Sequence, residues 1–76
     1  MLKDKARQKV VNESLRASSL YSPFKSYHEG IAIIREEYLE LEKEVFRSYG
    51  EQDLIKIANE ATHLGAMAIR FLEDLC

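Results

Sequence analysis

Two long segments with the apolar spacing of α-helices flank Gly50, and this pattern restricts the chain to a helical fold. Apolar side chains recur in alternating steps of three and four residues in each segment, which is the period of one helix face. A narrow apolar seam of this kind is typical of one side of a helix bundle. Residues 4–19 carry a third helical pattern, which ends ahead of Pro23. The sequence therefore predicts an all-α fold, with an antiparallel helical hairpin that turns near Gly50 and an N-terminal helix before it.

Local signals mark the ends of the two longer helices. Ser26 with Glu29 has the Ser-x-x-Glu form of a capping box, so we expect the first helix to run from about Ser26 to about Ser48. Gly50 suits the left-handed conformation that follows many helix ends, and the second helix then begins near residue 53. The two seams are expected to form the core, and they consist of Ile31, Ile34, Tyr38, Leu41, Val45, Leu54, Ile57, Ala61, Leu64 and Ala68, continued by Phe71, Leu72 and Leu75.

The chain length predicts one domain, residues 1–76, that needs help to be stable. A domain this short buries only about 60% of the surface that its unfolded chain exposes. The single cysteine, Cys76, excludes an internal disulfide, which leaves partners or a metal as the stabilising factor. We therefore expect a homodimer or homotetramer built as a helical bundle.

Several function classes are excluded by composition and pattern. No apolar run approaches the roughly 20 residues that span a bilayer, and the first residues lack a signal peptide, so a cytoplasmic protein without membrane contact is expected. The N-terminal basic side chains are scattered around their helix, which argues against nucleic acid as a partner. The sequence also contains no glycine-rich phosphate loop, no zinc pattern of cysteine and histidine, and no nucleophilic triad.

Four potential metal ligands are placed symmetrically about Gly50. Glu40 and Glu60 are each ten residues from this glycine, and Glu37 and His63 are each thirteen from it. At a rise of about 1.5 Å per residue, an antiparallel hairpin brings Glu40 level with Glu60, and Glu37 level with His63. Hard divalent cations such as Mg²⁺ and Mn²⁺ prefer such oxygen ligands and keep water for substrate phosphates. The alternative is that these are ordinary surface acids of two helices.

The position of the acids around their helix favours the metal site over the solvated surface. At 100° per residue, Glu37 and Glu40 lie beside the apolar seam rather than opposite it, and Glu60 with His63 repeats this arrangement on the other helix. Carboxylates held together at a half-buried edge repel each other, and one takes up a proton unless a cation neutralises the group.

Residues 26–76 contain a longer pattern in two parts, His28-Glu29-Gly30-x-Ala32-x-Ile34-x-Glu36-Glu37-x-x-Glu40-Leu41 and then Glu60-Ala61 with Ala66-Met67-Ala68-x-Arg70-Phe71-x-x-Asp74. This pattern resembles the MazG-like all-α nucleoside triphosphate pyrophosphohydrolases, most of all their small bacterial and phage members. The resemblance implies a helical dimer or tetramer that uses Mg²⁺ to hydrolyse a nucleoside triphosphate to a monophosphate and pyrophosphate. The rival interpretation is a non-catalytic oligomerisation or regulatory module that retains the same scaffold.

The resemblance also assigns roles to individual residues. It implies that Glu37, Glu40 and Glu60 bind Mg²⁺. We expect Glu36 and Glu37 to be the catalytic residues, with Glu36 or His63 orienting water or completing the metal shell. His63 stands where the family has Asp, which leaves three readings open: it binds Mn²⁺ or another transition metal, it contacts phosphate or water, or the site is degenerate.

Residues outside the acidic group are candidates for contacts with substrate. Arg70 lies near the line of His63 on the same predicted helix, so it is a candidate for binding a phosphate, with a surface salt bridge as the alternative. Three aromatic residues, Tyr21, Phe24 and Tyr27, could stack on a base or pack in the core.

Overall fold

The computed structural model describes residues 1–48 and 50–76, and this part of the chain is all-helical, as predicted. The three helices are α1 (Lys3–Leu20), α2 (Tyr27–Val45) and α3 (Leu54–Leu75). Helix α2 ends earlier than the expected boundary near Ser48. In the described residues, no helix is both long enough and apolar enough to cross a membrane.

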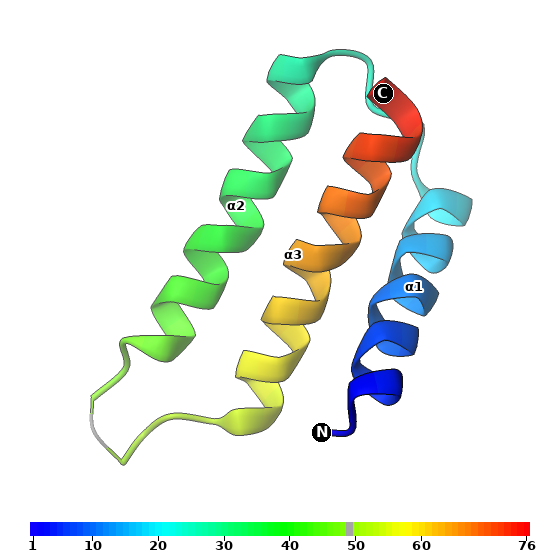
Figure 1. Cartoon of the computed structure of the whole chain (residues 1–76). Coiled ribbons are helices and arrows are strands. Elements are labelled where there is room, and N and C mark those ends of the chain that lie inside the picture. Colours follow the sequence, from blue (N-terminus) through cyan, green and yellow to red (C-terminus); the bar gives the residue numbers. More distant parts are fainter. Residues whose placement is uncertain (49) are drawn as a thin grey trace.

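The helices form a single layer in which α3 lies between α1 and α2 (Figure 1). Helix α3 packs against both neighbours, while the backbones of α1 and α2 make no close contact with each other in the described ranges. Helices α2 and α3 run in opposite directions (Figure 1). The molecule measures 40 × 27 × 19 Å.

Polar side chains cap α2 and α3 where the sequence places cap residues. The Ser26 Oγ accepts a hydrogen bond of 3.0 Å from the backbone N–H of Glu29 at the start of α2. Asp53 accepts hydrogen bonds from the backbone N–H groups of Ile55 and Lys56 at the start of α3. Between the two helices, Gly50 has a φ of 86°, a left-handed conformation that side chains other than glycine rarely adopt.

Glycines allow both neighbours to approach α3 closely. A Cβ on Gly30 of α2 would lie 2.6 Å from Cδ2 of Phe71 and 3.0 Å from Cδ1 of Leu75 on α3. On the other side, a Cβ on Gly65 of α3 would lie 3.1 Å from Cγ1 of Val10 on α1. The contact at Gly30 therefore helps to set how close α2 lies to the residues of α3 that face it.

Replacing Gly30 by valine is expected to destabilise the fold by about 1–3 kcal/mol, because the added methyl groups overlap Phe71. The measurement is urea unfolding of Gly30→Val beside Ala32→Val, an exposed position on the same helix, each compared with the wild type. Because glycine is about 1 kcal/mol less favourable than alanine in a helix, helix preference alone would make Gly30→Val the more stable variant. A Gly30→Val protein that is more stable than Ala32→Val by that amount would contradict the close packing of α2 on α3.

The buried core is small, and the expected core seams are largely exposed. Among the described residues, four apolar side chains are buried, and partly buried neighbours pack on them: the four are Ala17, Phe24, Ala66 and Met67. The prediction that the seams form the core was wrong for many seam residues, because a single layer of helices leaves one of its faces uncovered. The exposed seam residues include Ile31, Tyr38, Val45, Leu54, Ala61, Ala68 and Leu72.

Candidate metal centre and adjoining pocket

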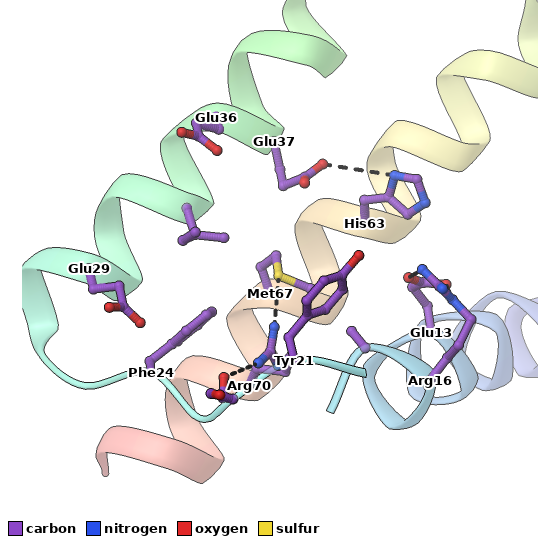
Figure 2. A pocket seen from close by; sticks show the side chains of 13 residues that line it. Glu13, Arg16, Tyr21, Phe24, Glu29, Glu36, Glu37, His63, Met67 and Arg70 are labelled. Atoms are coloured by element: carbon purple, nitrogen blue, oxygen red, sulfur yellow. Dashed lines mark hydrogen bonds and ion pairs between the residues drawn. The ribbon is translucent and has the colours of Figure 1, made fainter. Parts of the chain in front are cut away.

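Helices α2 and α3 bring Glu37, Glu60 and His63 together. The His63 Nδ1 lies 3.8 Å from Oε2 of Glu37 and 3.7 Å from Oε2 of Glu60. One donor atom from each residue lies within 4.8 Å of the others. Glu60 and His63 are three residues apart and so project from one side of α3, while Glu37 reaches across from α2 toward the imidazole (Figure 2).

Two carboxylate oxygens in this group have no partner. The Oε2 atoms of Glu37 and Glu60 are buried from solvent and receive no hydrogen bond from any described residue. Leaving a charged group buried and unsatisfied is costly, because its lost hydration is not replaced. The arrangement therefore favours a proton or a cation between these oxygens.

Burial and neighbouring charge disfavour ionisation of both carboxyl groups. Burial is the main cause that raises the pKa of Glu37, and the negative charge of Glu40 adds to it. The pKa of Glu60 is also raised, first by burial and then by the neighbouring carboxyl group of Glu40. Glu40 is exposed and lies outside the three-donor group, although it interacts with both of its carboxylates. A divalent cation would remove this repulsion.

These three residues could hold a divalent metal ion. Donors about 2.1 Å from one ion lie roughly 3.0–3.5 Å from each other at octahedral or tetrahedral angles, so the side chains, with His63 3.7 and 3.8 Å from the two carboxylates, would have to draw closer together around an ion. Two carboxylates with one imidazole nitrogen suit Mn²⁺ and similar transition metals better than Mg²⁺. Three protein donors leave further coordination positions for water or substrate oxygens.

A pocket of about 370 Å³ adjoins Glu37 and His63 and draws on all three helices (Figure 2). Glu36, which is exposed, and Glu37 line it from α2. Sequence reasoning missed the contribution of α1, where Arg16 donates two hydrogen bonds to Glu13. This pairing holds the pKa of Glu13 below its usual value. The sequence pattern of α1 does not indicate that this helix lines a pocket, because α1 reaches the pocket only through its packing on α3.

Arg70 lies in the wall of this pocket and is buried, with 3% of its surface exposed. Its guanidinium stacks over the ring of Phe24, with 4.6 Å from Cζ to the ring centroid. It donates one hydrogen bond of 3.0 Å to the carbonyl of Ser22 and a long contact of 3.7 Å to the sulfur of Met67. The alternative of a surface salt bridge was therefore wrong, because the segment before α2 covers this side chain. Asp74 accepts a hydrogen bond from the backbone N–H of Phe24, which ties that segment to α3.

Comparison with known proteins adds no relative: neither a family model, nor a curated protein, nor a solved structure matches this chain.

Proposed function

We propose that the protein is a metal-dependent hydrolase that converts a nucleoside triphosphate to a monophosphate and pyrophosphate. The observation that carries the proposal is the pair of buried carboxylate oxygens of Glu37 and Glu60, without hydrogen-bond partners and beside His63. The pocket next to them is large enough for part of a nucleotide. The resemblance of residues 26–76 to MazG-like pyrophosphohydrolases supplies the reaction class.

Each residue of the site has a proposed role. Glu37, Glu60 and His63 would hold the metal ion, with Glu40 as an additional carboxylate that can turn toward it. A bound ion of this kind polarises phosphoryl oxygens and lowers the pKa of a coordinated water. Glu36 lines the pocket beside Glu37 and remains exposed, so its carboxylate is free to orient water and accept its proton.

Self-association is part of this proposal, because the single layer of helices lacks a second layer to cover it. A compact protein of 8.8 kDa exposes about 4,800 Å² of surface, whereas this chain exposes 5803 Å². The excess is on the order of the 800 Å² that each partner contributes to a standard interface. We propose that a second copy of the chain covers this surface. The two copies would meet through their apolar faces, each formed by the exposed seam residues Ile31, Tyr38, Val45, Leu54, Ala61, Ala68 and Leu72.

The apolar face and the pocket lie on opposite sides of the layer. Tyr38 lies two residues after Glu36 on α2, and Leu72 lies two residues after Arg70 on α3. Two residues correspond to a rotation of about 200° around the helix axis, so Tyr38 points away from Glu36 and Leu72 points away from Arg70. Tyr38 and Leu72 are exposed, while Glu36 and Arg70 line the pocket. Association through the apolar face therefore leaves the pocket open to substrate.

The reaction is tested by incubating the protein with nucleoside triphosphates and Mn²⁺ or Mg²⁺. Monophosphate and pyrophosphate are expected, rather than diphosphate and orthophosphate, because water attacks the α-phosphorus. His63→Asp replaces an imidazole with a hard oxygen ligand and is expected to shift the preference from Mn²⁺ toward Mg²⁺. If neither the wild type nor His63→Asp cleaves any triphosphate, the non-catalytic module becomes the better interpretation.

A further inference from the structure

The pocket wall beside Arg70 is built partly by the segment that follows α1, where the Ser22 carbonyl accepts a hydrogen bond from Arg70. Tyr21 and Ser22 line the pocket from this segment, Ala17 lines it from α1, and Ile33 and Met67 line it from α2 and α3. Of the residues with a role in the proposed reaction, Glu36, Glu37 and His63 line the pocket. The wall beside Arg70 has no role in that reaction.

Of the three candidate aromatic residues, Tyr21 and Phe24 line the pocket, and Tyr21 is the exposed one. Phe24 is buried and its ring is covered by the Arg70 guanidinium. Tyr27 stacks on Phe71, with 6.1 Å between ring centroids, and does not line the pocket. Tyr21 lines the pocket, is 61% exposed, and stacks on no aromatic ring of the described residues. Its ring is therefore free to stack on a planar group.

Arg70 provides polar recognition at the same end of the pocket. Among the described residues, its Nε is buried and has no hydrogen-bond partner, and its Nη1 donates to the sulfur of Met67, a weak acceptor. No carboxylate of the described residues pairs with this buried cation. A buried guanidinium with unfilled donor capacity is stabilised by an oxygen acceptor that a ligand brings.

The spacing between the two ends of the pocket sets the shape of that ligand. Arg70 follows His63 by seven residues on α3, which corresponds to about 10 Å along the helix. A ligand that spans the pocket therefore has phosphate oxygens at the carboxylate end and an oxygen acceptor near Arg70. The middle part of such a ligand would contact Tyr21 and the apolar side chains of Met67 and Ile33, which also line the pocket.

We infer that this wall binds the nucleoside part of the substrate, with the base stacked on Tyr21 and a base carbonyl oxygen accepting hydrogen bonds from Arg70. The inference rests on the proposed function, because the phosphates are assigned to the metal end. Arginine only donates hydrogen bonds, so it matches bases that present a carbonyl oxygen. Adenine carries no carbonyl oxygen and offers only ring nitrogens as acceptors, so we expect it to bind more weakly than a base with a carbonyl oxygen.

Calorimetry with Mn²⁺ tests the role of Tyr21, using uridine monophosphate and inorganic tripolyphosphate as probes. Tyr21→Ala is expected to weaken binding of the monophosphate by about 5- to 150-fold, the loss of one stacked base, and to leave tripolyphosphate binding unchanged. The matched control is Tyr27→Ala, which removes the same ring outside the pocket and should change neither affinity. Unchanged binding of the monophosphate to Tyr21→Ala would overturn the inference.

Base preference provides the second arm of the experiment. Adenosine monophosphate is expected to bind the wild type about 5- to 150-fold more weakly than uridine monophosphate, since one good arginine contact to a base is worth about 1–3 kcal/mol. Equal affinity for the two overturns the assignment of Arg70. A wild type that cleaves triphosphates but fails these binding tests retains the proposed function and loses only the inference, whereas a wild type that binds neither probe loses both.

Discussion

Manganese ions are expected to raise the melting temperature of the wild-type protein by about 10–20 °C when the free ion is in roughly 100-fold excess over its dissociation constant. Binding to the folded state alone then adds about 2.7 kcal/mol. In a domain of this size each kcal/mol shifts the melting temperature by about 4–8 °C. The physical reason is the pair of buried, unpartnered oxygens of Glu37 and Glu60, whose repulsion the cation relieves.

Glu60→Gln is expected to remove most of this shift, because it replaces a charged ligand with a neutral amide of the same shape. In chelator the same variant should melt above the wild type, since it no longer buries a carboxylate beside Glu37 and Glu40. Glu73→Gln, an exposed position on the same helix, is the matched control and should keep the full response to Mn²⁺. A Glu60→Gln protein that is less stable in chelator and equally stabilised by Mn²⁺ would show that the carboxylate is only structural.

The dependence of stability on pH gives an independent check in chelator. The pKa values of Glu37 and Glu60 are raised above the ordinary 4.5, so the folded state holds these protons more tightly than the unfolded state. Their destabilising effect is absent below about pH 4.5 and grows as pH rises through the raised pKa values. The wild type should therefore lose stability relative to Glu60→Gln over that interval. A constant difference between the two would contradict the burial of this carboxyl group.

The helices could be predicted from the sequence because their signals are local. Apolar periodicity, the Ser26 cap and the left-handed Gly50 each depend on neighbouring residues alone, and the structure has all three. Glu60 and His63 lie one helical turn apart whatever the tertiary fold, so their proximity also follows from the sequence. Spacing about Gly50 predicted that Glu37 would be level with His63, and the two side chains lie 3.8 Å apart.

Features that depend on contacts between distant segments could not be predicted in this way. The burial of Arg70 results from residues 22–24 folding over α3, about fifty positions away in sequence, and its own helix gives no sign of that cover. The pocket wall from α1 has the same origin. The seam residues Ile31 and Tyr38 have the periodicity of a core, yet periodicity does not reveal whether the covering layer comes from the same chain or from a second copy.

Ile31→Glu is expected to convert a wild-type dimer into a monomer and to lower the melting temperature. Ile31 is 57% exposed in the single chain and belongs to the apolar face opposite the pocket. In a symmetric dimer the substitution occurs on both copies, and charges brought into a desolvated interface cost several kcal/mol. The dissociation constant should therefore rise at least about 100-fold. Sedimentation equilibrium at micromolar concentration measures this change directly.

Ala32→Glu provides the matched control, because it adds the same charge at an exposed position of α2 that is turned about 100° away from Ile31. This variant should remain associated. Association also makes the wild-type melting temperature rise with protein concentration, and Ile31→Glu should lose that dependence. A wild type that stays monomeric, with one melting temperature at every concentration, would mean that the exposed face of α2 and α3 is stable in water without a second copy.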